Sequence, residues 1–213
     1  VRDIMFGEMA ARFDHGVLTA DPFVERLVLF WSNHFAVDRT RAVPMRFLAG
    51  LFERQAIRPH VLGFLSDMLA AAVTHPAMLM YLDNHSSVGP NSRAGRRRAA
   101  RGGREGAVNE NLAREVLELH TLGAGGGYRQ ADVVALAETL TGWHGGFNPR
   151  RRIPTFLPGR HEPGPRTILG KTYPAGGADQ VFAVLEDLAL HPATGRHLAT
   201  KLARHFVGDD APP

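Results

Sequence analysis

One stretch of the sequence, NENLAREVLELH at positions 109–120, concentrates side chains that could do chemistry. On a helix, four polar residues of this stretch share one arc of about 100°: Asn111, Arg114, Glu115 and Glu118. Two carboxylates at i and i+3 can share a cation, or divide into acid and base when burial separates their pKa values. An arginine beside them can hold an anionic substrate group. The arc is therefore a candidate catalytic site.

The same residues indicate a metal site if neighbouring segments supply further ligands. The predicted ligand set is His34, Asp83, Glu115, Glu118 and His120. Carboxylate-rich sets suit calcium, magnesium or manganese better than zinc, and the His-Glu-x-x-His pattern of a zinc helix is absent. The chain has no cysteine, which excludes thiolate metal sites and disulfides. No cofactor-binding motif is present, because the glycine-rich GAGGGY lacks the spacing of a phosphate-binding loop.

Each of these residues also has a structural interpretation. Arg114 is flanked by Glu110 and Glu118 at helical spacing, as on an ordinary exposed helix. His34 and His120 lie on apolar faces, where a histidine is commonly a hydrogen-bonded core residue. Asp83 follows a short helix and fits a helix-ending turn. The sequence leaves both interpretations open.

Helical periodicity runs through most of the chain and predicts an all-α fold, a multi-helix orthogonal bundle of about eight or nine helices in one domain over 1–213. The helices are expected near 1–14, 22–35, 44–57, 59–75, 76–83, 109–121, 130–142, 178–190 and 192–207. Phe23, Leu27 and Phe30 are expected on the core face of the second helix. Prolines and glycines predict one irregular, loop-rich excursion near 144–178, in which RTILGKTY fits a short strand.

The net charge of +4 comes from a single segment. Residues 91–106 hold six arginines and one glutamate, so the rest of the chain is close to neutral. No aromatic residue lies among these arginines and the positive charge is confined to one segment, so nucleic acid is not an expected partner. We expect the arginine-rich segment 90–106 to be a solvated, variable loop. No window is apolar enough for a membrane span.

Four stretches in order carry a family resemblance: RLVLFWSNHFAV, PAMLMYLDN, NENLAREVLELHTLGAGGGYRQADVVALAETLTGW and HPATGRHLATKLARHFV. Together they resemble the bacterial family known as domain of unknown function 1800, over essentially the whole chain. The resemblance implies that the chain is an interior fragment, because members are usually about twice as long. It also implies a bacterial source and an exported or periplasmic location. A sulfatase-like protein encoded nearby is an implied partner, and the family brings no established activity.

The family's polar signature falls on positions outside the helix 109–120 as well: Asn33, His34, Asp83, Asn84, Trp143 and His161. The sequence departs from it at Ser32, where relatives often have a second histidine. Glu162 replaces a frequent aspartate, and Arg129 a frequent threonine.

Two functions of different classes fit these residues. The first is a metal-dependent, hydrolase-like enzyme whose site is lined by helix 109–120. The second is a non-catalytic, exported binding or assembly module in which the polar helix is a structural network. The burial of the polar arc distinguishes the two functions. An active site needs the arc to open onto a cleft shared with His34 and Asp83, whereas a structural network needs it to be enclosed by protein groups. The oligomeric state is not encoded in any of these features.

Overall fold

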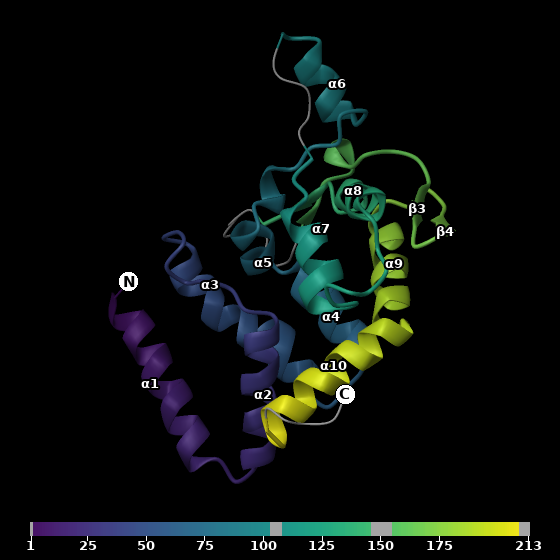
Figure 1. Cartoon of the computed structure of the whole chain (residues 1–213). Coiled ribbons are helices and arrows are strands. Elements are labelled where there is room, and N and C mark those ends of the chain that lie inside the picture. The colour runs from purple at the N-terminus through teal and green to yellow at the C-terminus, as the bar shows by residue number, and fades with distance from the viewer. Residues whose placement is uncertain (1, 103–107, 146–154, 209–213) are drawn as a thin grey trace.

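The computed structural model describes residues 2–102, 108–145 and 155–208 (Figure 1). In these ranges the chain is mostly helical, which confirms the all-α prediction. The α-helices are α1 (Arg2–Leu18), α2 (Pro22–His34), α3 (Met45–Phe52), α4 (Leu65–Thr74), α5 (Pro76–Tyr81), α6 (Arg93–Ala99), α7 (Asn111–Glu115), α8 (Gln130–Thr139), α9 (Ala178–Leu190) and α10 (Pro192–Phe206). Two π-helical segments, η1 (Glu53–Ile57) and η4 (Val116–His120), directly continue α3 and α7. Three 3₁₀ turns complete the described helical elements: η2 (Arg58–His60), η3 (Asn84–Ser86) and η5 (Pro158–Arg160).

The hydrophobic core lies where α4, α5, α7, α8 and α9 meet. Its fully buried members include Leu69, Met78, Leu112, Leu136 and Val184. Burying side chains of this size removes about 1.5–3 kcal/mol of unfavourable hydration each. The polar helix α7 therefore sits against the core by its apolar side, and its position is fixed by packing.

Two His-Pro-Ala sequences start helices in the same way. His75 and His191 each accept a hydrogen bond at Nδ1 from the backbone N–H two residues further on. The following proline occupies the first helical position, where no N–H is needed. The sequence predicts both helix starts from the proline alone. The structure shows that the histidine before each proline also caps the helix.

The predicted core face of α2 is partly wrong. Phe23 is 60% exposed and Leu27 is half-buried, whereas Glu25, Val28 and Phe30 are buried. Glu25 is buried because Arg58 donates to both of its carboxylate oxygens, at 2.6 and 3.1 Å. A paired carboxylate therefore occupies a place that periodicity assigns to an apolar residue. The predicted start of the fourth helix at Pro59 is also wrong. Pro59 lies in η2, and α4 begins at Leu65.

The π-helical turn η4 changes which side chains of the polar helix face the core. Periodicity places Leu119 on the apolar side, but Leu119 is 47% exposed while Leu122 is 3% exposed. A π turn bonds i to i+5, so it takes up one residue more than an α turn and rotates everything after it. His120 stays on the buried side, as periodicity predicts, and is 3% exposed.

The irregular excursion contains two small antiparallel pairs within the described residues. Strand β1 (Trp143–His144) pairs with β2 (Thr155–Phe156), and β3 (Arg166–Ile168) pairs with β4 (Lys171–Tyr173). RTILGKTY is therefore a hairpin rather than one strand. Its turn residues Leu169 and Gly170 both have positive φ, at 50° and 78°, as a two-residue hairpin turn requires. Residues 146–154 of the excursion lie outside the described ranges.

The arginine-rich segment forms an ordered element where the sequence predicted a loop. Residues 93–99 form α6, and the Ser92 hydroxyl caps it by accepting from the Gly95 N–H at 3.0 Å. Figure 1 shows α6 projecting from the body of the molecule. Its arginines are all exposed, which agrees with the predicted solvation, and residues 103–107 lie outside the described ranges.

Candidate functional site

The polar arc of α7 and η4 lies at the surface and is bonded to neighbouring protein groups. Asn111 and Arg114 are exposed, whereas Glu115 and Glu118 are half-buried. The Arg114 guanidinium donates to Glu110 Oε2 at 2.9 Å and to the Gln130 side-chain oxygen at 3.1 Å. The Arg114–Glu110 pair is the i, i+4 arrangement expected from the sequence.

The two carboxylates that share the arc have different surroundings. Burial raises the pKa of Glu115, and the neighbouring Glu118 carboxylate adds to the rise. Glu118 differs in its surroundings, because the Tyr128 hydroxyl donates to its Oε2 at 3.1 Å. The pair thus has the chemical asymmetry that an acid–base couple needs.

The predicted metal ligands lie in three separate places. Glu115 and Glu118 are on the α7 surface, and His34 and His120 form a buried pair with ring centroids 5.9 Å apart. Asp83 lies on an exposed turn, has a left-handed backbone with φ 59°, and forms an ion pair with Arg41. Among the described residues, no three histidine or carboxylate side chains are grouped so that they could hold a metal ion.

The buried histidines close the end of the polar helix. His34 Nε2 lies 3.1 Å from the carbonyl oxygen of His120 and therefore carries the hydrogen. Its Nδ1 then accepts from the Lys201 ammonium at 2.9 Å. His197 Nε2 bonds the Leu119 carbonyl oxygen at 3.2 Å in the same manner. These rings satisfy carbonyls that the helix end leaves without partners.

Burial keeps His34 and His120 of this cluster uncharged. It is the largest cause lowering the pKa of His34 to about 3, and the nearby Lys201 and His120 add to the effect. Burial, followed by Lys201, lowers the pKa of His120 to about 3. Burial also lowers the pKa of Lys201. His120 Nδ1 is buried and bonds no group in the described ranges, so one ring nitrogen of this cluster is left unsatisfied.

A basic pocket lies beside this cluster, between the glycine turn and α10. Its volume is about 310 Å³. Residues 122–126 form one wall, and the other wall carries Arg196, His197, Lys201 and Arg204. Among the described residues, no carboxylate lines it. In the described part of the chain, the Arg196 and Arg204 side chains form no ion pair, so their charges are not neutralised there.

Glycine 123 makes the approach of α10 possible. Its φ is +83°, and an added Cβ would lie 2.9 Å from His197 Nδ1. Only a glycine tolerates both conditions without displacement. The run GAGGGY therefore serves a close contact that shapes the pocket, and the exposed Ala124 and Gly125 leave the turn's backbone accessible.

The remaining signature positions mainly hold the excursion in place. The buried Asn84 amide donates to the Leu140 and Trp143 carbonyl oxygens, at 3.1 and 3.4 Å. His161 Nδ1 bonds the Thr141 carbonyl oxygen at 2.9 Å. Beside it, Glu162 is 3% exposed.

Sequence reasoning missed the basic side of α10. The sequence predicts a helix over 192–207, but that prediction takes no account of the basic residues in HPATGRHLATKLARHF. Its basic residues at 196, 197, 201 and 204 fall within one broad helix face, and this spacing was the available signal.

The fold and this pocket define an all-α domain with a cationic cavity formed by a glycine turn and its last helix. The family model described as protein of unknown function (DUF1800) matches residues 2–213. The chain belongs to this family. No curated protein and no solved structure matches it. No helix in the described ranges is long and apolar enough to cross a membrane.

Proposed function

We propose that the protein is a binding module for a small molecule that carries a phosphate or sulfate group. The observation that supports this proposal is the cationic lining of the α10 pocket. Arg196 and Arg204 offer planar forks of N–H donors that match such oxyanions, and Lys201 adds a third positive charge. The volume of about 310 Å³ is near the lower end for small-molecule sites.

The pocket also has the properties that make a charge contact effective. Lys201 is half-buried, and its bond to His34 fixes the ammonium in place. The glycine turn has no large side chain that would keep a ligand from the backbone. An anion held here would be surrounded by donors whose positions are set before binding.

The test is calorimetric titration with 4-nitrophenyl phosphate and 4-nitrophenyl sulfate, which separate the two oxyanions. The Arg196→Gln/Arg204→Gln variant should raise Kd by roughly 10²- to 10⁴-fold, since it removes two charge-assisted bonds of about 1.5–3 kcal/mol each. Arg97→Gln on α6 is the matched control, because it removes an exposed arginine elsewhere. Equal affinities for the wild type and the double variant would contradict the proposal. Release of 4-nitrophenol in the same cell would instead identify an enzyme.

A metal-dependent hydrolase is the second candidate function, and the Glu115–Glu118 pair favours it. The raised pKa of Glu115 beside a hydroxyl-bonded Glu118 is the pattern of an acid–base couple or of a shared cation site. In this candidate Asn111, Arg114 and the two glutamates act on the substrate, and His34, Asp83 and His120 would have to move towards them.

Metal content decides this second candidate. Inductively coupled plasma mass spectrometry of the protein purified without chelator should find about one calcium, magnesium or manganese ion per chain. Glu115→Gln should remove that metal, because the amide keeps the shape and loses the charge. Glu186→Gln, an exposed substitution on α9, is the control. A wild-type protein free of metal would exclude the candidate.

A further inference from the structure

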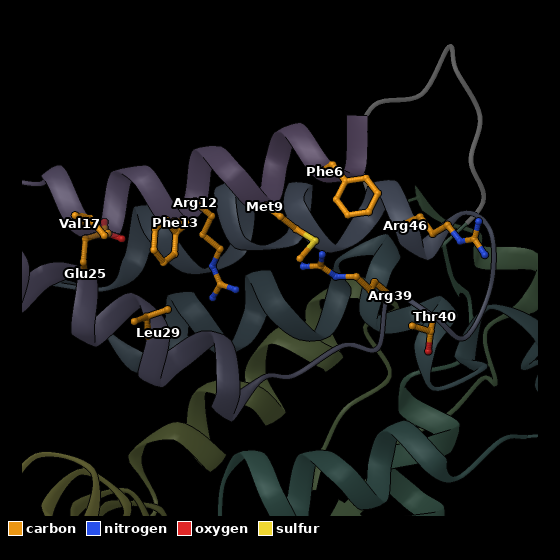
Figure 2. A pocket seen from close by; sticks show the side chains of 11 residues that line it. Phe6, Met9, Arg12, Phe13, Val17, Glu25, Leu29, Arg39, Thr40 and Arg46 are labelled. Atoms are coloured by element: carbon orange, nitrogen blue, oxygen red, sulfur yellow. The ribbon is translucent and has the colours of Figure 1, made fainter. Parts of the chain in front are cut away.

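A second cavity, unrelated to the basic pocket, lies between α1 and the body of the molecule. Its volume is about 870 Å³, and Figure 2 shows the side chains that line it. Phe6, Met9, Phe13 and Val17 of α1 form one apolar wall, and Leu29 of α2 contributes to the other. We call it the α1 groove.

The groove exists because no side chain described in α1 belongs to the hydrophobic core, so polar contacts attach the helix. Two ion pairs link it to the body among the described residues, Glu8 to Arg54 at 2.9 Å and Arg12 to Glu53 at 2.7 Å. His15 Nε2 also lies 3.0 Å from a Glu25 carboxylate oxygen. Met9, Phe13, Val17 and Leu29 remain exposed between the two surfaces.

The apolar walls carry a large unburied hydrophobic surface. Phe13 is 72% exposed, Val17 65% and Leu29 47%. Phe6, Met9, Phe13 and Val17 recur at steps of three or four residues, so they form a continuous row along one side of α1. A contiguous apolar surface of this kind usually marks a binding site for an apolar group.

Among the described residues, charge without an ion-pair partner is confined in the groove to Arg39 and Arg46. Arg12 and Glu25 also line it, but they are paired with Glu53 and Arg58. Figure 2 shows the half-buried Arg39 extending its guanidinium towards Met9, whereas Arg46 lies beyond Phe6 and points away from the apolar row. The groove is thus apolar from Met9 to Val17 and cationic next to Met9.

We propose that the α1 groove binds a single-chain amphiphile with an anionic head group, such as a fatty acid. The carboxylate lies against Arg39, with the positive charge of Arg46 further along, and the acyl chain follows the row from Met9 to Val17. Met9 to Val17 spans about 12 Å of helix, which matches an extended chain of roughly ten carbons beyond the carboxylate. A volume of about 870 Å³ lies within the range of small-molecule sites. Complementary charge at a single end favours this ligand over a purely apolar one.

The experiment is calorimetric titration of the whole chain with sodium dodecanoate below its micellar concentration. We expect saturable binding of one dodecanoate per chain. Hexanoate has the head group without the length, and dodecyltrimethylammonium has the length with the opposite charge. Both should bind at least tenfold more weakly than dodecanoate.

Variants at the two ends of the groove separate the head-group and chain contacts. Arg39→Gln/Arg46→Gln should weaken dodecanoate at least tenfold and strengthen dodecyltrimethylammonium, because the repulsion of its cationic head group is removed. Phe13→Ser should weaken both, and the exposure of Phe13 makes this change safe for the core. Arg196→Gln/Arg204→Gln should leave the dodecanoate Kd unchanged. The proposal for the basic pocket and the proposal for the α1 groove can therefore be refuted separately.

Three outcomes would overturn the proposal. One is the absence of saturable dodecanoate binding, and another is equal binding by the wild type and both groove variants. The third is a dimer in sedimentation experiments that Phe13→Ser converts to a monomer and that dodecanoate does not dissociate. That result would assign the groove to a second copy of the chain.

Discussion

Acidification from pH 7 to pH 5 is expected to lower the free energy of unfolding by about 2 kcal/mol for each of three buried histidines. These are His34, His75 and His120, which are 4%, 5% and 3% exposed. Burial lowers the pKa of His75 to about 4, and the pKa values of the other two lie at about 3. In the unfolded chain each ring titrates near pH 6.5.

The sign follows from proton binding. Between about pH 6.5 and pH 3 the unfolded chain binds a proton at each ring and the folded chain does not, so acid favours unfolding. This contribution is absent above pH 6.5, grows as the pH falls, and is complete below the folded pKa. Because stabilities of domains are about 5–15 kcal/mol, the combined loss at pH 5 is a large fraction of the total.

Urea denaturation at pH 7 and pH 5 measures the loss, and His75 provides the sharpest variant. His75→Asn keeps an acceptor for the Ala77 N–H at the start of α5 and removes the titrating ring. The difference in unfolding free energy between the two pH values should therefore shrink by about 2 kcal/mol. His60→Asn is the control, because the His60 side chain forms no hydrogen bond or ion pair in the described ranges. An unchanged pH difference in His75→Asn would refute the assignment.

Replacing Glu162 with alanine is expected to cost about 2–5 kcal/mol of stability. Its two carboxylate oxygens accept from the Asn91 backbone N–H at 2.8 Å and from the Asn91 side chain at 2.7 Å. The Glu162 N–H donates to the buried Thr141 hydroxyl at 2.7 Å. Alanine would remove the partner of both Asn91 donors and, with it, the link between the segments around Asn91 and Glu162. It would also remove a carboxylate that lies 3.9 Å from Arg166.

The close packing around Glu162 leaves little room for the structure to relax after the substitution. A Cβ on Gly89 would lie 2.5 Å from the Glu162 carboxylate and 2.6 Å from its Cα, so the chains pass in direct backbone contact. Thermal unfolding of Glu162→Ala measures the cost, and hydrogen exchange should rise in β3 and β4. Glu186→Ala on the exposed face of α9 should change stability by less than about 0.5 kcal/mol. Equal melting temperatures for the two variants would show that Glu162 is not a structural anchor.

Much of the fold could be predicted because local signals agree with tertiary packing. Prolines at helix starts identify α2, α5 and α10, and periodicity identifies α8 and α9. The errors arise where tertiary contacts override the local pattern. Phe23 is exposed because the Glu25–Arg58 pair occupies the buried side of α2, and Leu119 is exposed because of the π turn. No periodicity rule anticipates either feature.

The candidate site was predicted in part, for a similar physical reason. The sequence identified the polar arc and the buried position of His120, since both depend on one helix. The basic pocket joins Gly123 to α10, more than seventy residues away in the chain, and only folding brings them together. The α1 groove depends on polar contacts between three helical segments, which no single segment encodes.

The π turn means that the segment Val116–His120 contains one residue more than an α-helical turn needs. Deleting one residue there would yield a shorter and more regular helix, in which the turn closes by α-helical bonds. The loss of the residue and the change from π to α compensate, so the residues beyond would keep nearly the same orientation relative to α7. His34 and His197 would then still meet carbonyls at the helix end, and the wall of the basic pocket would stay beside α10. A family member with a single-residue gap at this point is therefore expected to keep the pocket.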